Sequence, residues 1–285
     1  MKNIPYNHSN RRKFRIRKAS GEIEPFSKKK LCQSLEHSGL PKVKCKIIAD
    51  DIAGKVGEGS PTYEIYEKTL SALKGTSPLA SIHYSLKKSL FDLGPEGHHF
   101  ETYTARYFEE IGHQTETCRV LEGKYVKHEV DVIATLKGKR YFSECKFHNH
   151  SGVKNDIKIA LYVKARWDDL RDGPEGKNLH GFYVISNTKF SIDAITYAKG
   201  TGLKLLGVNC PAQHSFLDEI KKLKLYPVTS LTQINKNIKN QLLARNILLA
   251  KDLIDEKSFL IKLGLSAGQM EKVFQEIHFL QRDKR

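Results

Sequence analysis

The sequence has few cysteines and no stretch suited to a membrane. Its five cysteines are scattered and form no C-x-x-C pair, which argues against a disulfide framework and against a structural zinc site. No apolar run approaches the roughly 18 residues that a membrane helix requires, and the first thirteen residues are polar and basic. We therefore expect a cytoplasmic protein without membrane contact. The cysteines are Cys32, Cys45, Cys118, Cys145 and Cys210.

Acidic residues are also scarce relative to basic ones. Lysine and arginine number 48 against 32 aspartates and glutamates, a formal charge of +16. Such an excess favours polyanionic partners, because binding to nucleic acid releases counterions from the phosphates. The charge alone favours DNA only modestly over RNA or a membrane surface, and it also serves solubility. No G-x-x-x-x-G-K-[ST] loop is present, so a P-loop motor is not indicated.

A predicted β-hairpin over residues 129–146 carries three charges. β-Branched and aromatic runs flank Lys137-Gly138-Lys139, which is turn chemistry. A two-residue loop at Lys137-Gly138 would set Asp131 opposite Glu144, and one at Gly138-Lys139 would set it opposite Lys146. Either loop places all three charges on one face. A three-residue loop would move Asp131 to the other face unless a bulge corrected the register.

Two carboxylates and an ammonium on one patch suit a cation. Asp131 and Glu144 offer the oxygen ligands that Mg²⁺ prefers, and Lys146 can orient a metal-bound water or offset charge on a phosphate. This predicts metal-assisted phosphodiester hydrolysis. The alternative is a solvated strand, because E-x-K is common on exposed strands. The hairpin, the spacing of Asp131 and the helix expected upstream favour the nuclease.

The same residues resemble the PD-(D/E)xK nuclease superfamily. Asp131 is followed thirteen residues later by Glu144-Cys145-Lys146, and D-V-I-A, G-K-R-Y and E-C-K look like its Mrr-like restriction endonuclease branch. In that branch an upstream helix carries Phe-Glu, met here by Phe100-Glu101. The resemblance implies that Glu101 can join a Mg²⁺ site made by Asp131 and Glu144.

Residues 14–93 resemble an ATP-cone, a small nucleotide-binding domain. Two short strands around a turn and four helices are expected, and the family's pattern is met by Ile16, Lys18, Gly21, Phe26, Lys30 and Leu31. The resemblance implies that ATP or dATP is bound by Lys18, Glu24, Lys30 and Thr62. Ala19-Ser20 replaces the family's Arg-Asp, which removes one phosphate-binding cation. A basic surface for DNA is the alternative.

The remaining segments complete a multidomain prediction. We expect a basic arm at 1–13, a Gly-Pro linker at 94–97, a nuclease domain over 98–227 and a helical module over 228–285. Alternation of helices and strands in the nuclease domain predicts a mixed sheet flanked by helices, with Ile111 and Leu161 among their core positions. Elsewhere, helices are expected over 28–37, between Ser27 as cap and Gly39, and over 235–250, and Thr62 is expected to cap another helix. In the last segment, L-I-K-L-G-L-S-A-G-Q-M is similar to a helix-hairpin-helix motif, which can hold phosphate. A plain bundle or dimerisation module is the alternative.

The sequence therefore predicts an α/β, multidomain, Mg²⁺-dependent DNA endonuclease of restriction type, regulated by adenine nucleotide. One alternative is a nucleotide-responsive DNA-binding regulator on an inactive nuclease scaffold. Another is a ribonuclease. The sequence leaves open whether the chain forms a homo-oligomer.

Overall fold

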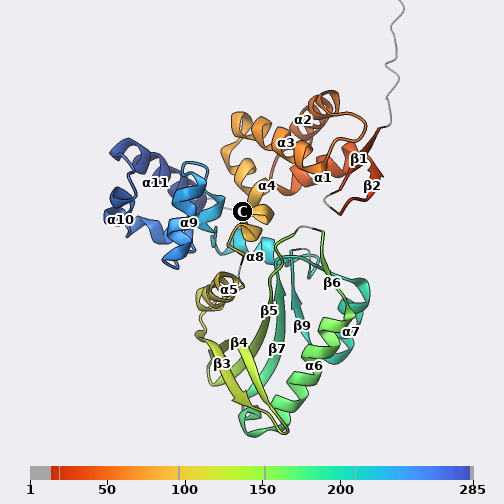
Figure 1. The fold of residues 1–285 in the computed structure, drawn as a ribbon, viewed down its shortest axis with the longest axis vertical. Helices are drawn as coiled ribbons and strands as arrows, with labels where there is room; N and C mark the ends of the chain where they lie inside the picture. The colour runs from red at the N-terminus through yellow and green to blue at the C-terminus, as the bar shows by residue number, and fades with distance from the viewer. Residues whose placement is uncertain (1–13, 19, 96, 151, 209, 283–285) are drawn as a thin grey trace, which may run out of the picture. The chain divides into compact units, whose positions relative to one another are not determined.

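The structure, a computed structural model, describes residues 14–18, 20–95, 97–150, 152–208 and 210–282 (Figure 1). It has the expected α/β, multidomain architecture with a central mixed sheet. The chain divides into two compact units, one up to Tyr84 and one from Ser85 onward. The expected basic arm at 1–13 lies outside the described residues. None of the helices in the described ranges combines the length and apolarity that a bilayer crossing requires.

The first unit is a β-hairpin followed by helices. Its elements are β1 (Arg15–Arg17), β2 (Ile23–Pro25), α1 (Lys28–His37), α2 (Lys42–Lys55), α3 (Thr62–Thr76) and the start of α4 (Pro78–Phe91). The hairpin is antiparallel, with Ile16 paired to Glu24. Ser27 caps α1, because its side chain accepts the backbone N–H of Lys30. Thr62 is the first residue of α3 rather than its cap, which is Pro61.

The second unit is built on a five-stranded sheet. Its strands are β3 (Gln114–Glu122), β4 (Lys127–Leu136), β5 (Lys139–Lys146), β7 (Leu179–Ser186) and β9 (Lys204–Leu206), in the order β3-β4-β5-β7-β9. The first three strands are antiparallel, and β5, β7 and β9 are parallel. A separate small sheet pairs β6 (Lys154–Asn155) with β8 (Lys189–Phe190). The mixed sheet follows from the expected order: one hairpin, then helical crossovers.

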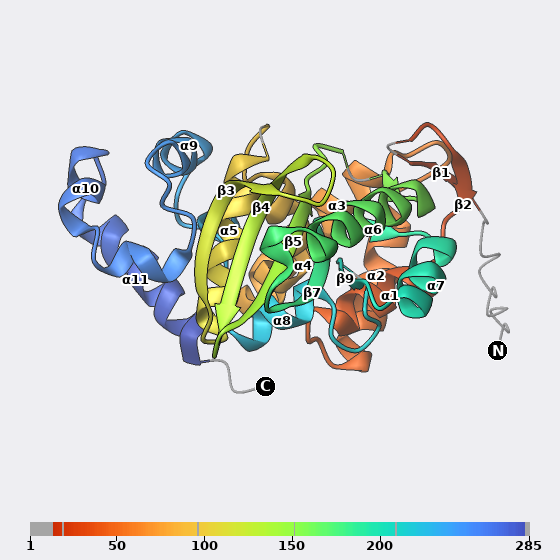
Figure 2. The ribbon, with the colours of Figure 1, turned by 90° about the horizontal axis from the view of Figure 1, so that it is seen from below.

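Helices cover both faces of this sheet. Helix α5 (His98–Glu110) lies on one face, where Phe108 meets Tyr183 edge to face at 5.4 Å. Helices α6 (Ile157–Asp172) and α7 (Ile192–Thr201) lie on the other (Figures 1 and 2). Two expected core positions are wrong. Ile111 is 37% exposed because α5 ends at Glu110, and Leu161 is 45% exposed because Ala160 and Val163 face the sheet instead.

The hairpin between β4 and β5 has a two-residue loop. Lys137 and Gly138 both have positive φ, of 50° and 76°, which is the type I′ geometry that matches the twist of paired strands. The pairs run from Leu136↔Lys139 to Val132↔Ser143. This register, the first of the alternatives considered above, places Asp131 opposite Glu144.

The C-terminal segment is helical as expected, with shorter helices. They are α8 (Phe216–Lys222), η2 (Val228–Ser230), α9 (Lys236–Ala244), η3 (Ala250–Ile254), α10 (Lys257–Lys262) and α11 (Ala267–Arg282). The helix expected over 235–250 ends at Ala244, because Asn246 takes a left-handed φ of 58°. Lys224 and Gly264 are left-handed in the same way after α8 and α10.

Helix α5 also contacts the C-terminal helical segment. The Tyr103 hydroxyl donates to the carbonyl of Leu225. The Arg106 guanidinium donates to both carboxylate oxygens of Asp252, at 3.0 and 3.1 Å. Glu110, the last residue of α5, accepts a hydrogen bond from the Lys251 ammonium at 2.5 Å. One helix therefore packs on the sheet with one side and is bound to the C-terminal segment with another.

Candidate active site

Asp131 lies where β4 and β5 end their pairing. Its Oδ2 accepts the backbone N–H of Cys145 at 2.6 Å, so the carboxylate turns toward β5. Burial, and after it the negative charge of Glu144, raises the pKa of Asp131 from 3.8 to about 7. The charge of Glu101 adds to this rise. The position therefore has an excess of negative charge with little access to water.

Glu144 is buried and doubly paired. It is 4% exposed, and its Oε1 lies 2.5 Å from the Lys146 ammonium. Its Oε2 accepts from the Arg166 guanidinium, which also donates to the backbone carbonyl of Glu129. A buried carboxylate requires such partners, since an unpaired one is costly.

Arg166 is the residue that the sequence interpretation missed. It lies on α6 and is 8% exposed. The signal was present: Ala160, Val163 and Leu170 mark the buried stripe of this helix, and Arg166 falls on the same stripe by the period of 3.6 residues. An arginine at a core position needs a buried acid, and Glu144 supplies it.

Glu101 comes to this site from α5, in the first turn of the helix. Its Oε2 accepts from the Cys118 thiol at 3.4 Å, and Cys118 lies on β3 opposite Asp131 by the register Thr117↔Val132 and Arg119↔Val130. The structure thus brings Glu101, Asp131, Glu144 and Lys146 to one end of the hairpin, as the sequence predicted. Their catalytic roles stay predictions.

The donor set fits a hard divalent cation. Three carboxylates, those of Glu101, Asp131 and Glu144, meet two cations, Lys146 and Arg166. Both cations pair with Glu144, so Asp131 and Glu101 keep uncompensated oxygen atoms. Mg²⁺ is usually held by one or two carboxylates and retains several waters. Asp131 and Glu101 would be its first ligands. Glu144 lies opposite Asp131 on the neighbouring strand β5.

The residues expected to bind nucleotide lie together in the first unit. Glu24 joins Lys18 at 2.9 Å and Lys30 at 3.2 Å, and the ammonium of Lys18, then that of Lys30, holds the pKa of Glu24 below its ordinary value. Glu24, Lys30 and Thr62 line a cavity of about 210 Å³. Ligand pockets begin at about 300 Å³, so this cavity has room for one part of a nucleotide.

The walls of this cavity are apolar and aromatic. Tyr66 and Tyr84 stack with their ring centroids 5.5 Å apart. The other apolar lining residues are Ile16, Phe26, Leu31 and Ile65. A flat ring is the kind of group that such walls accept. The charged residues that line this cavity are Glu24 and Lys30.

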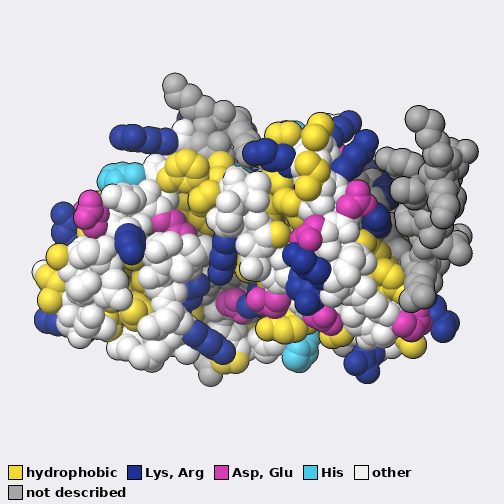
Figure 3. Space-filling view, turned by 90° about the horizontal axis from the view of Figure 1, so that it is seen from above, with side chains coloured by type: hydrophobic (Ala, Val, Ile, Leu, Met, Phe, Trp, Pro, Cys, Tyr) yellow, Lys and Arg dark blue, Asp and Glu magenta, His cyan; other side chains and the backbone are white. Residues whose placement is uncertain are grey.

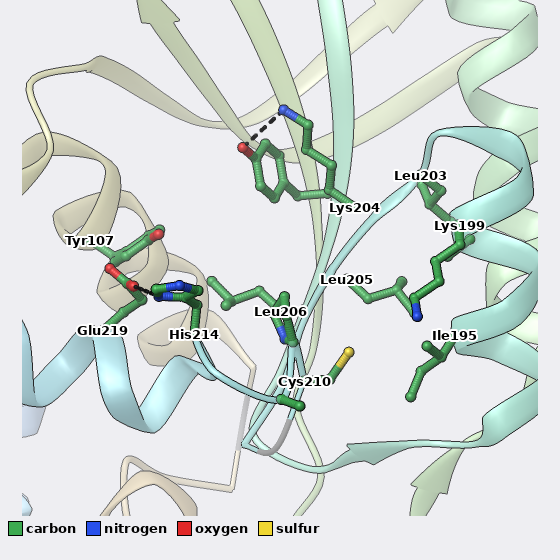
Figure 4. Close-up of a pocket in the computed structure, with 14 residues that line it drawn as sticks. Tyr107, Ile195, Lys199, Leu203, Lys204, Leu205, Leu206, Cys210, His214 and Glu219 are labelled. Carbon is green, nitrogen blue, oxygen red and sulfur yellow. Dashed lines mark hydrogen bonds and ion pairs between the residues drawn. The ribbon is translucent and has the colours of Figure 1, made fainter.

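A larger cavity, about 510 Å³, lies beside the edge strand β9 (Figure 4). Ile195 and Lys199 of α7 line one side, and Tyr107 of α5 lies on the other. Lys204 donates to the Tyr183 hydroxyl at 3.3 Å. None of the predicted catalytic residues is among the residues lining this cavity, so its size does not make it the catalytic centre.

Figure 3 shows lysine and arginine side chains spread over one face, with acidic side chains among them. The charge of +16 is therefore not gathered into a single block on this face. Phosphate contacts distributed over a surface remain compatible with electrostatic binding of a polyanion.

The fold and the site define a mixed α/β protein with a buried acidic centre at the end of a hairpin. A profile described as AF1548-like, C-terminal, matches residues 226–280. An uncharacterized protein of Archaeoglobus fulgidus is 35% identical over 178 residues, which are 60% of this chain and 96% of that protein. The chain therefore belongs to the AF1548-like family.

One solved structure agrees with this assignment. The crystal structure of AF1548, a protein of unknown function, shares 30% identity and a TM-score of 0.51, and the match covers 66% of this chain and 97% of that one. The MspJI restriction endonuclease in complex with an oligonucleotide is 14% identical with a TM-score of 0.37, over 59% of this chain and 36% of that one. This second similarity is weak and concerns the fold.

Proposed function

We propose that the protein is a Mg²⁺-dependent nuclease that hydrolyses phosphodiester bonds in DNA. The observation that carries the proposal is the convergence of Asp131, Glu144, Lys146 and Glu101 from two strands and a helix. A stable core avoids such a cluster, since burial, and after it the repulsion between the carboxylates, raises the pKa of Asp131. A bound cation would offset this repulsion.

Each side chain has a distinct part. Bound Mg²⁺ would supply an activated water and stabilise charge on the phosphate. Asp131 and Glu101 would hold the ion, and the N–H of Cys145 fixes the orientation of Asp131. Lys146, half-exposed at the end of β5, can hold a proton near the attacked phosphate while it remains anchored to Glu144. Arg166 holds Glu144 in place through their ion pair.

DNA is the favoured substrate class because of the net charge and because the turn after α10, at Gly264, is similar to that of a helix-hairpin-helix motif. A ribonuclease uses the same chemistry, and the two are separated by substrate. A DNA-binding regulator on an inactive scaffold is the other candidate. The complete set Asp131, Glu144 and Lys146 speaks against it, since binding alone does not require a buried acidic cluster.

The test is cleavage of plasmid DNA and of a matched RNA by purified protein, with Mg²⁺ and with EDTA. Glu144→Gln should reduce cleavage by at least about a hundredfold, because it removes a charge from the reacting centre. The matched control is Glu122→Gln, an exposed glutamate of β3 whose side chain is 63% accessible. Equal cleavage by both variants would refute the assignment of the site.

Regulation by adenine nucleotide belongs to the same proposal. The cavity beside Glu24 and Lys30 would take the base against Tyr66 and Tyr84, with the phosphates toward the lysines. Calorimetry of the full chain with ATP, dATP and ADP tests this. Lys30→Ala should weaken binding, and Lys55→Ala, a surface lysine paired to Asp51, should not. Absence of heat with all three nucleotides would leave the first unit without a nucleotide role.

A further inference from the structure

A second group of metal-binding side chains lies beside the acidic centre. The ligand atoms of His98, Glu101 and Cys118 all lie within 4.8 Å of one another. His98 opens α5 and Glu101 follows three residues later, so both leave the same side of the helix. Cys118 meets them from β3, with its thiol 3.4 Å from Glu101. Three different donor types, nitrogen, oxygen and sulfur, thus face one point.

The backbone at Cys118 is unusual. Its φ is +52°, a left-handed conformation that residues other than glycine, asparagine and aspartate seldom adopt. Such conformations are strained and persist where the surroundings impose them. Here the flanking pairs Thr117↔Val132 and Arg119↔Val130 hold β3 in register on both sides. The left-handed position occurs at the cysteine that contacts Glu101.

The electrostatics favour a cation at this point. Burial raises the pKa of the Cys118 thiol to about 11, and the negative charges of Glu101, Glu129 and Asp131 add to this rise. His98 and Cys118 are exposed, so an ion can enter from solvent. Replacement of the thiol proton by a metal would remove the repulsion between a thiolate and these carboxylates.

We propose that His98, Glu101 and Cys118 bind a thiophilic divalent ion of the zinc class. Thiolate and imidazole select such ions over Mg²⁺, which prefers oxygen. Zinc lies about 2.3 Å from sulfur and about 2.0–2.1 Å from nitrogen, so tetrahedral ligands stand roughly 3.3–3.8 Å apart. Rotation of His98 and Cys118 closes the remaining distance. Three protein ligands leave the fourth position open to water.

This site goes beyond the proposed nuclease because it does not depend on cleavage, although the two sites share Glu101. An ion of the zinc class at His98 and Cys118 would draw Glu101 away from Asp131. The two metals therefore compete for one carboxylate.

Titration of the full chain with Co²⁺ under nitrogen tests the site. A thiolate ligand gives a charge-transfer absorption in the near ultraviolet that a carboxylate site lacks. Cys118→Ser should abolish this absorption, and His98→Gln should weaken Co²⁺ binding by about tenfold or more. The matched controls are Cys32→Ser and His180→Gln, a partly buried thiol and an exposed imidazole elsewhere. Both should leave the spectrum unchanged.

Two results would overturn the proposal: no thiolate absorption in the wild type, or an absorption that survives Cys118→Ser. Failure of the nuclease proposal has a different signature. Asp131→Asn should keep the Co²⁺ absorption whether or not the wild type cuts DNA. Loss of cleavage with a retained spectrum separates the two sites, and a spectrum without any cleavage leaves the metal site standing alone.

Discussion

Asp131 and Glu144 occupy equivalent positions across one hairpin, yet their surroundings differ. Glu144 has two cationic partners, whereas Asp131 has a backbone N–H and two acidic neighbours. One carboxylate is therefore paired with two cations, whereas the other lies beside like charges. That difference makes Asp131 the side chain with the most to gain from a bound cation.

Asp131→Asn should stabilise the metal-free protein at alkaline pH. The folded-state pKa is about 7 against an ordinary 3.8, so the ionised group costs stability that sets in as pH rises above about 4 and is complete above about 7. In EDTA at pH 8 the variant should be more stable by about 1–3 kcal/mol, and the gain should vanish near pH 4. Thermal unfolding measures it. Mg²⁺ should then raise the melting temperature of the wild type alone; a variant less stable at pH 8 contradicts the charge argument.

Arg166→Met should destabilise the protein by about 3–5 kcal/mol, because it leaves Glu144 buried with one cation only. The double variant Glu144→Gln/Arg166→Met should recover much of this loss, since no buried charge is then unpaired. Denaturant unfolding of the four proteins in the cycle gives the coupling. Additive losses would mean that the two residues do not interact as the structure shows.

At the level of single residues, the sequence predicted the acidic cluster and Lys146 but missed Arg166. Asp131, Glu144 and Lys146 are local to one hairpin, so turn chemistry and a period of two were enough. Arg166 lies on a helix, 22 residues after Glu144 in the sequence. Cys118 lies on β3, and no sequence pattern predicts its left-handed backbone conformation. Contacts between elements distant in sequence depend on packing, which local patterns do not encode.

The ends of the helices were predicted correctly where the residue that ends the helix is recognisable from the sequence. The helix over 28–37 was predicted with both bounds, because Ser27 and Gly39 mark its ends. The helix expected over 235–250 was too long, because Asn246 is an ordinary polar residue in a periodic pattern and only its left-handed φ ends the helix. Glycine in this position is recognisable from sequence, as at Gly264, and asparagine or lysine is not.

Lys137→Asn should stabilise the hairpin. Lys137 has φ +50°, which asparagine tolerates better than lysine, and Asn-Gly is the preferred type I′ pair. We expect a gain of about 0.5–1 kcal/mol, measured by denaturant unfolding. Lys139→Asn, in the adjacent strand, is the control and should stabilise nothing. A loss of stability at position 137 would imply that the lysine side chain has a contact of its own.

For the whole molecule, the excess of basic residues predicts salt-sensitive DNA binding. The logarithm of affinity should fall linearly with the logarithm of salt concentration, with a slope of about −0.9 for each phosphate neutralised on duplex DNA. Fluorescence anisotropy in EDTA, which prevents cleavage, measures the slope. Asp131→Asn should leave the slope unchanged, because the role proposed for Asp131 is to hold a cation and not to contact the phosphate backbone. A slope near zero would remove the electrostatic basis for a nucleic-acid partner.

Helix α5 presents Glu101 at the acidic centre and holds Leu225 and Asp252 through Tyr103 and Arg106. Any ligand that shifts the C-terminal helices along these bonds also shifts a carboxylate of the centre. Linkage between two binding equilibria is reciprocal: DNA that alters the affinity for the cation by some factor must have its own affinity altered by that factor when the cation binds. If the protein binds both as proposed, helix α5 would couple the two equilibria, and the metal ion and the nucleic acid would be effectors of each other.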